Sequence, residues 1–295
     1  MQRTASATRR NVRGWIFSAP YVVFLLAFGI VPAVWAIVQS LRPVMAPGQI
    51  SLANYFTVFQ DFRFLPAAIN VLTFMAIWIP VMVLGTLILA LLLHHRVSRS
   101  GGPLRLVYFL PGAVTGSAAV MLWYFMLSPE LSPWAPALHA MGFEHNNQVF
   151  TTSNLAVIFA IVAFATGVGQ WIVIMYGALQ SVSQDVLEAA RIDGAGAFRT
   201  AISIKLPLIG KYVAYMVILS FAAALQVFVE PQLFYAITQA GSSWWSLNQL
   251  GYTFAFQQGD FGMSAAVSVV LLVFAMVAAV ILIFRTNFFQ TEVDS

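Results

Sequence analysis

The chain has 295 residues, of which 60% are hydrophobic and 8% are charged, with a formal net charge of +4 at pH 7. A soluble domain of this length could not bury so much apolar surface, so the composition indicates a membrane protein with several spans. The absence of cysteine excludes disulfides, thiol nucleophiles and thiolate metal sites.

Six apolar stretches are long enough to form membrane spans, because a helix needs about 20 apolar residues to cross a bilayer. We predict spans at residues 15–39, 70–93, 104–127, 154–176, 208–228 and 264–284. The first follows several arginines but exceeds the apolar length of a signal peptide, so we expect it to be retained. The predicted fold class is an all-α polytopic membrane protein with six transmembrane helices.

The basic residues indicate which side of the membrane each loop faces. Six spans place both termini on one side, and only Arg42 and Arg63 of the 14 Lys and Arg residues fall on the other. Basic residues concentrate in cytoplasmic segments, so we predict cytoplasmic N and C termini. The predicted organisation is a cytoplasmic tail, a first span with an external loop, a transmembrane core of five helices and a second cytoplasmic tail, at residues 1–13, 14–65, 66–285 and 286–295.

Proline and glycine recur within the predicted spans. Prolines at positions 20, 32, 80 and 111 predict kinks, which membrane helices accept when neighbours bond the freed carbonyl groups. Gly112 and Gly116 form a GxxxG pattern in the third span, and Gly167, Gly169 and Gly177 lie in or beside the fourth. Small residues at these positions predict close approach between helix backbones.

A polar segment at residues 181–207 separates the fourth and fifth spans and carries six charged residues. Ser181 and Gln184 have the spacing of a capping box, Asp185 suits the positive end of a helix dipole, and Gly194 suits the position after a helix end. We therefore predict a short helix over residues 184–193, about 15 Å long at 1.5 Å per residue. Such a helix is marginal alone and needs a partner surface, which we assign to Val186, Ala189, Ala190 and Asp193.

The same segment contains a spaced motif, Glu188-Ala189-Ala190, then Gly194, then Ile204, Leu206 and Pro207. The motif resembles the cytoplasmic EAA loop of binding-protein-dependent ABC importer permeases, and Asp193 and Phe198 resemble its carbohydrate-type branch. Elsewhere Asn54-Tyr55 and residues 257–272 are similar to sugar permeases. The resemblance implies a type I ABC importer permease fold. It also implies that an ATPase subunit contacts a coupling helix through Glu188, Ala189, Ala190, Arg191, Asp193, Gly194 and Phe198.

The resemblance further implies the partners and the location of the chain. It implies a second permease subunit in a heterodimer, two ATPase subunits and an extracytoplasmic substrate-binding protein or lipoprotein. ATP and Mg²⁺ would belong to the ATPase subunits, with no cofactor in this chain. The implied location is the bacterial plasma (inner) membrane, which the chain crosses several times in contact with lipid. The basic residues form no single patch, so we expect no nucleic-acid partner.

The sequence contains no recognisable catalytic motif. A phosphate-binding GxxxxGK[ST] pattern is absent, because Lys211 is followed by Tyr212 and the first glycine is missing. HExxH and GxSxG patterns are absent as well. His139 and His145 lie in a loop with one nearby acid, Glu144, so we expect no metal site. We therefore predict a non-catalytic transport subunit, with ATP hydrolysis on a separate polypeptide.

Polar and aromatic side chains at membrane depth are the candidates for a solute pathway. An unpaired polar group in hydrocarbon is costly and usually faces a cavity or another helix, and aromatic rings can stack on the C–H faces of a sugar. The candidates are Asn70, Trp123, Gln170, Trp171, Gln226, Phe228, Glu230 and Tyr235. The alternative is that Gln170 and Gln226 bond neighbouring helices and that Asn70 and Glu230 lie at the membrane interface.

We therefore predict a permease subunit of an ATP-driven ABC importer that forms half of the pathway for a sugar or a related polyol or glycerol-phosphate-type solute. The alternative is an ion- or proton-coupled secondary transporter that acts without an ATPase. That class is typified by membrane-buried charges and paired repeats, neither of which the sequence shows clearly. A membrane-embedded transferase would need catalytic residues that the sequence lacks.

Overall fold

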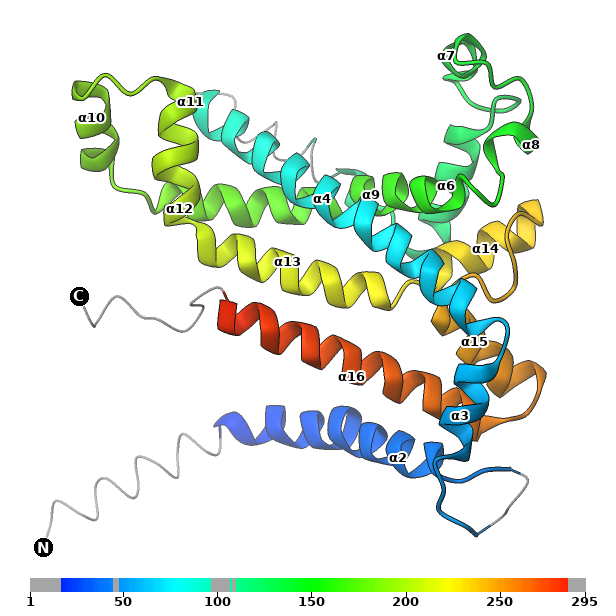
Figure 1. The fold of residues 1–295 in the computed structure, drawn as a ribbon. Helices are drawn as coiled ribbons and strands as arrows, with labels where there is room; N and C mark the ends of the chain where they lie inside the picture. Colours follow the sequence, from blue (N-terminus) through cyan, green and yellow to red (C-terminus); the bar gives the residue numbers. More distant parts are fainter. Residues whose placement is uncertain (1–16, 45–47, 97–106, 108–109, 286–295) are drawn as a thin grey trace, which may run out of the picture. The chain divides into compact units, whose positions relative to one another are not determined.

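The computed structural model describes residues 17–44, 48–96, 107 and 110–285 (Figure 1). Within these ranges every regular element is a helix, which confirms the all-α prediction. The chain divides into two compact units, Met1–Asp61 with Gly251–Val270 and Phe62–Leu250 with Leu271–Ser295, here called unit 1 and unit 2. The predicted tails, 1–13 and 286–295, lie outside the described residues.

Four helices in the described part of the chain are long and apolar enough to cross a membrane. They correspond to the first, second, fourth and sixth predicted spans. They are Phe17–Ser40, which ends in α2 (Val31–Ser40), α4 (Phe64–Arg96), α9 (Leu155–Gln180) and α16 (Phe261–Arg285). A fifth span is present if one bent pair of helices is counted together, so the total of six and the cytoplasmic termini stay predictions.

The third predicted span is interrupted, so the expectation of one continuous helix over residues 104–127 was wrong in its described part. A 3₁₀ turn, η2 (Leu110–Ala113), is followed by a break and then by α6 (Gly116–Leu127). Gly116 begins α6 with φ +61°, in the left-handed region that favours glycine. The predicted GxxxG pair therefore does not share a helix.

Gly112 nevertheless makes the close backbone contact that was predicted for it. A Cβ atom at this position would lie 2.7 Å from the carbonyl oxygen of Thr166 in α9. Only a residue without a side chain lets η2 approach α9 this closely. Gly116 and Gly177 differ, because a Cβ atom on either would meet nothing within 4 Å.

The fifth predicted span begins with a sharp bend. The segment Ala197–Leu208 meets α13 (Gly210–Leu225) at 71°. This segment comprises α11 (Ala197–Thr200), the π-helical η3 (Ala201–Lys205) and α12 (Leu206–Leu208). Proline has no amide hydrogen to continue a helical ladder, and Pro207 stands two residues before the bend at Ile209. The span itself is accordingly shorter than residues 208–228.

The core of unit 2 forms around α9. In its most apolar stretch 44% of residues are buried, compared with 28% in α4, so α9 is the central helix. Small residues bring α4 and α9 together: a Cβ atom at Gly85 would lie 2.6 Å from the ring of Phe164, and one at Gly167 would lie 2.9 Å from the Met82 methyl group. Helix α13 packs on α4 and α9 and completes the core.

An aromatic cluster closes one end of this core. The indole of Trp245, which is buried, meets the Phe159 ring edge-on with centroids 4.9 Å apart, and Phe234 contacts Phe159 at 5.4 Å. Several stretches between the predicted spans are themselves partly helical. They contain α7 (Ala135–Ala140), α8 (Asn146–Val149), α14 (Val229–Thr238), α15 (Leu247–Tyr252) and η4 (Thr253–Gln257).

Unit 1 is held together by the side chain of Asn54 in α3 (Ala53–Gln60). The Asn54 amide nitrogen donates to the carbonyl oxygens of Ser40 at 2.9 Å and Arg42 at 3.2 Å. A Cβ atom at Gly262 would lie 2.6 Å from that nitrogen, so Gly262 permits α16 to pack against it. The neighbouring Tyr55 shares a hydrogen bond of 2.7 Å with the Ser40 hydroxyl. The Asn54-Tyr55 pair therefore has a structural role in turning the chain after α2.

We expect Gly112→Ala to destabilise unit 2, because the new methyl group would collide with the α9 backbone at Thr166. Overpacking of this kind costs about 1–3 kcal/mol, so the midpoint of thermal unfolding of the detergent-purified protein should fall. Gly177→Ala is the control, since its position in α9 is open. An equal fall in both variants would show that the contact at Gly112 is not tight.

Candidate functional site

The first candidate region is the polar segment between α9 and α13, whose predicted helix is α10 (Gln184–Ile192). Its N-cap is Ser183, whose hydroxyl oxygen accepts from the Asp185 amide at 3.2 Å. The predicted capping box on Ser181 was wrong, because the Ser181 hydroxyl instead donates to the carbonyl of Ala178 at the end of α9. Asp185 does occupy the first turn, where a negative charge suits the helix dipole.

The end of α10 is a complete Schellman motif, as the glycine predicted. Gly194 has φ +73°, its amide donates to the Arg191 carbonyl at 3.0 Å, and the Ala195 amide donates to the Ala190 carbonyl at 2.9 Å. These two bonds satisfy carbonyl groups that a helix end otherwise leaves open. The helix is therefore fixed at both ends by its own sequence.

The surface of α10 that was predicted to meet a partner is exposed except at Ala190. Leu187 and Ala190, three residues apart, are buried. Leu187 and Val182 belong to the hydrophobic core of unit 2. Ala190 therefore faces inward, whereas Val186 and Ala189 are exposed. Of the seven predicted coupling residues, Ala190 is buried and Glu188, Ala189, Arg191, Asp193, Gly194 and Phe198 are exposed.

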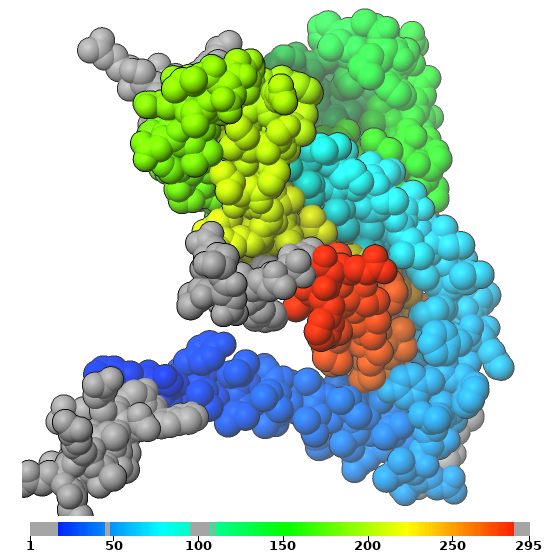
Figure 2. Space-filling view, turned by 60° about the vertical axis from the view of Figure 1, so that its left-hand side comes forward, coloured from blue at the N-terminus to red at the C-terminus, as the bar shows by residue number. Residues whose placement is uncertain are grey.

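The exposed side of this segment is apolar in places. Ile192 is 86% exposed and Phe198 is 80% exposed, although both are large hydrophobic residues. The yellow-green atoms of the segment project from the surface of unit 2 in Figure 2. Figure 1 places α10 at the opposite end of α9 from α7 and α8. An exposed apolar surface beside charged residues is typical of a protein interaction site.

Lys205 connects this segment to the end of α4. Its amino group lies 3.0 Å from Nδ1 of His94 and shares a hydrogen bond with it. Burial of Lys205, and secondly the positive charge of Arg191, lower the pKa of its ammonium group below the ordinary value. The charge of Arg191 on α10 therefore affects Lys205, at the contact between η3 and α4.

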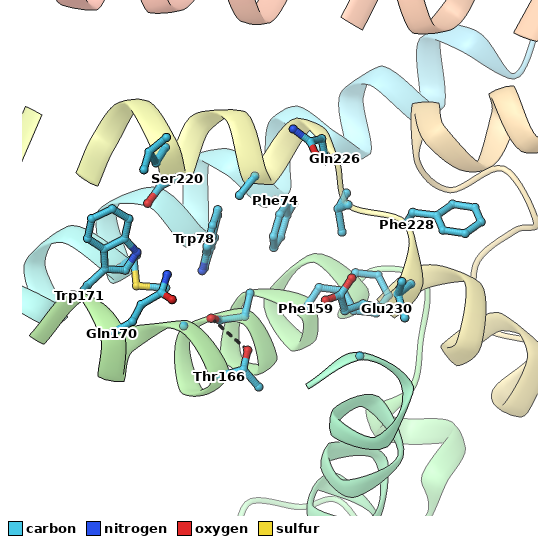
Figure 3. A pocket seen from close by; sticks show the side chains of 18 residues that line it. Phe74, Trp78, Phe159, Thr166, Gln170, Trp171, Ser220, Gln226, Phe228 and Glu230 are labelled. Atoms are coloured by element: carbon cyan, nitrogen blue, oxygen red, sulfur yellow. Dashed lines mark hydrogen bonds between the residues drawn. The ribbon is translucent and has the colours of Figure 1, made fainter. Parts of the chain in front are cut away.

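The second candidate region is a cavity of about 550 Å³ inside unit 2, within the size range of small-molecule sites (Figure 3). Its walls come from α4, α9, α13 and the junction between α13 and α14, together with Gly116 of α6. The lining residues are Phe74, Trp78, Met82, Gly116, Phe159, Ala163, Thr166, Gly167, Gln170, Trp171, Leu219, Ser220, Ala223, Gln226, Val227, Phe228, Val229 and Glu230.

The cavity brings together five of the eight residues predicted for a solute pathway. Gln170 and Trp171 come from α9, Gln226 and Phe228 from the α13–α14 junction, and Glu230 from the first turn of α14. They lie apart in the sequence and meet because α13 packs on α9. Most of the remaining lining is apolar or aromatic.

Three predicted pathway residues do not line the cavity. The side-chain amide of Asn70 donates to the carbonyl of Trp245 at 3.1 Å, so it holds a loop in place. Trp123 is partly buried against the hydrophobic core, and Tyr235 lies further along α14.

Sequence reasoning missed three polar residues of the cavity, namely Trp78, Thr166 and Ser220. Trp78 lies in α4 and Ser220 in α13, and both side chains are almost completely buried. Tryptophan and serine are ordinary in membrane helices, so neither residue type signals a site. The distinguishing feature is their hydrogen-bond status, which only the folded arrangement reveals.

The fold and these two regions together define the membrane-spanning component of a solute transport system. The chain belongs to the family of binding-protein-dependent transport system inner membrane components, whose model matches residues 50–290. This confirms the resemblance, the permease class and the inner-membrane location. Family membership also decides against a secondary transporter that acts alone.

Individual relatives match nearly the whole chain. The probable ABC transporter permease protein YurN of Bacillus subtilis is 29% identical over 288 residues, which cover 94% of this chain and 96% of that protein. The arabinooligosaccharides transport system permease protein AraP of Halalkalibacterium halodurans is 25% identical, covering 95% and 90%. The sn-glycerol-3-phosphate transport system permease protein UgpA of Escherichia coli is 28% identical, covering 90% and 91%.

A solved structure has the same fold. A chain of the bacterial alginate ABC transporter, crystallised in complex with an alginate pentasaccharide-bound periplasmic protein, superposes with a TM-score of 0.80. The match covers 98% of this chain and 99% of that one, at 18% sequence identity. It confirms the ABC importer permease fold.

We expect Ser183→Ala to loosen α10, because its first turn would lose the cap on the Asp185 amide. Loss of an N-cap costs about 0.5–2 kcal/mol, so hydrogen exchange measured by mass spectrometry should quicken across residues 181–196. Ser181→Ala is the matched control, since that hydroxyl bonds only within the end of α9. Equal exchange in the two variants would contradict the assignment of the cap.

Proposed function

We propose that this chain is one of two permease subunits of an ATP-driven importer, and that α10 couples it to an ATPase subunit. The single observation that carries the proposal is the construction of α10. The helix is capped at both ends, packed on unit 2 along one side and exposed along the other. A helix of nine residues has marginal stability by itself, so its exposed side is suited to contact with a partner protein.

The ATPase subunit is the partner that the family motif supplies for this surface. Glu188, Ala189 and Gly194 are motif positions, and all three are exposed. Ile192 and Phe198 offer apolar anchors beside them, and Arg191 and Asp193 offer charge. An interface with apolar anchors inside a charged rim suits a specific and regulated contact.

Contacts of α10 and the segment after it would transmit a movement of α10 to the helices of unit 2. Leu187 belongs to the hydrophobic core of unit 2, and the pair Lys205–His94 joins the segment after α10 to α4. Packed interiors transmit displacement because they contain few voids. Closure of the ATPase on ATP would move α10, and with it α4 and α9, which form walls of the cavity.

The cavity is then this chain's half of the solute pathway. ATP-driven closure would open it outward to receive a solute from an extracytoplasmic binding protein, and hydrolysis would return it inward. ATP and Mg²⁺ would bind the two ATPase subunits, and the second permease subunit would supply the facing wall. The chain itself performs no bond-breaking step, so it is a transport subunit without enzymatic activity.

The solute is a sugar or a related polyol or glycerol-phosphate-type molecule. AraP is named for arabino-oligosaccharides and UgpA for sn-glycerol 3-phosphate, so the relatives favour this range of solutes. The lining of the cavity also suits such solutes, because it combines the aromatic rings of Phe74, Trp171 and Phe228 with a few polar groups. Sugars bind through such a combination of stacking and hydrogen bonds.

Affinity purification of the chain from its native membrane tests the proposal. We expect an ATPase and a second permease to co-elute, and ATP hydrolysis in proteoliposomes to rise when the loaded binding protein is added. Solute uptake driven by a proton gradient in proteoliposomes that contain this chain alone would overturn it.

We expect Glu188→Ala and Gly194→Asp to uncouple hydrolysis from transport while the protein still inserts in the membrane. Losing a coupling free energy of this type corresponds to a reduction of about 5- to 150-fold in stimulated transport. Uptake and ATP hydrolysis are measured in the same proteoliposomes.

Gly142→Asp is the matched control, because Gly142 also has a positive φ, +90°, in an open position. It follows α7, which Figure 1 places at the other end of unit 2 from α10. The control should retain transport despite comparable backbone strain. Wild-type transport in Gly194→Asp would count against coupling through α10.

A further inference from the structure

The cavity contains two hydrogen-bond groups with no partner. Among the described residues, the indole nitrogen of Trp78 and the hydroxyl oxygen of Ser220 are buried without any hydrogen bond. Trp78 is 6% exposed and Ser220 is 2% exposed, and both line the cavity. Buried polar groups in folded proteins nearly always have partners, so an unpaired group needs a specific reason.

The two groups belong to different helices and face the same space. Trp78 lies on α4 and Ser220 on α13, and in Figure 3 the indole nitrogen and the serine oxygen both point toward α9 across the cavity. Gln170 lies on the α9 side of this space. By contrast, Thr166 already donates to the carbonyl of Val162 at 2.8 Å. The open groups are therefore positioned for something that enters between the helices.

The aromatic residues that line the cavity favour the binding of an organic solute over water alone. The Trp78 ring stacks on Phe74 with centroids 5.4 Å apart and an angle of 7°, which presents a flat aromatic surface beside the free N–H group. Trp171 meets Tyr215 edge-on at 6.0 Å and is held in place. A flat ring beside a fixed donor matches a sugar, whose C–H face stacks while its hydroxyl groups accept and donate hydrogen bonds.

The described lining of the cavity carries negative charge and no positive charge. Among the described residues that line it, Glu230 is the only one with a formal charge, and no Lys, Arg or His is present. Glu230 lies in the first turn of α14, a position that suits an acidic residue. A carboxylate in a site of low dielectric repels an anionic solute and can still accept hydrogen bonds from hydroxyl groups.

We propose that the cavity takes an uncharged, hydroxyl-rich solute, that Trp78 and Ser220 donate hydrogen bonds to it, and that Glu230 excludes anions. The inference rests on the proposed transport function and narrows its solute class. It selects uncharged oligosaccharides over phosphate esters and acidic sugars.

Fluorine NMR of the purified assembly in nanodiscs tests this inference without the binding protein. Tryptophan is replaced by fluorotryptophan, and Trp78→Phe assigns the Trp78 resonance. The probes are three uncharged trisaccharides, arabinotriose, maltotriose and xylotriose, and one anion, sn-glycerol 3-phosphate, at equal concentrations. We expect at least one trisaccharide to shift the Trp78 resonance and the anion to leave it unchanged. The exposed Trp134 in the α7 segment serves as a spectator and should not respond.

Three variants assign the individual groups. Removing one net hydrogen bond should weaken trisaccharide binding by about 2- to 10-fold in Ser220→Ala, read at Trp78, and in Trp78→Phe, read at Trp171. Ser268→Ala is the control, because its hydroxyl donates within α16 to the Ser264 carbonyl. Glu230→Gln should let glycerol 3-phosphate shift Trp78, whereas the matched Glu144→Gln should not.

The results separate failure of this inference from failure of the proposed function. A Trp78 shift with glycerol 3-phosphate in the wild type, or no shift with any trisaccharide, would overturn the assignment of solute class. Unchanged affinity in both Ser220→Ala and Trp78→Phe would overturn the assignment of the donors. Co-elution with an ATPase and ATP hydrolysis by the same sample report on the importer function independently of these shifts.

Discussion

The close contact between α4 and α9 is the interaction on which the rest of unit 2 depends. In lipid, the hydrophobic effect does not hold helices together, so association relies on van der Waals packing and a few polar contacts. Gly85 receives the ring of Phe164, and Gly167 receives the methyl group of Met82. These two recesses let long helices approach along much of their length. The remaining helices are then arranged around this pair, and the cavity lies where α13 and the α13–α14 junction meet them.

The central helix α9 relates the two candidate regions. It contributes Thr166, Gln170 and Trp171 to the cavity and ends at Gln180, three residues before the cap of α10. Trp171 and Gln180 are nine positions apart, which is about 13.5 Å along a helix. A single rigid element therefore spans from the cavity to the polar surface. Leu187 joins that surface to the same hydrophobic core, to which Trp171 also belongs.

The amide side chains of this chain illustrate how differently one residue type can be used. Asn70 satisfies a loop carbonyl, Asn54 closes the turn after α2, and Gln170 faces a cavity. An unpaired amide costs free energy in an apolar environment, and these three amides have different surroundings. Rarity in an apolar chain therefore marks an amide as important without saying whether its role is structural or functional. Conversely, Trp78 and Ser220 look ordinary in the chain and stand out only through their missing partners.

The amino-acid sequence alone predicts the membrane class, the helical fold, four of the spans, the family motif, and the helix α10 with Gly194 at its C-terminal end. These features follow from local composition and spacing, because lipid requires apolar helices and a helix end requires particular residues. The tertiary structure decided the break at Gly116, the 71° bend before α13, the inward turn of Ala190 and the membership of the cavity. These depend on which helices pack together, and the hydrogen bonds that a buried group lacks are a property of that packing alone.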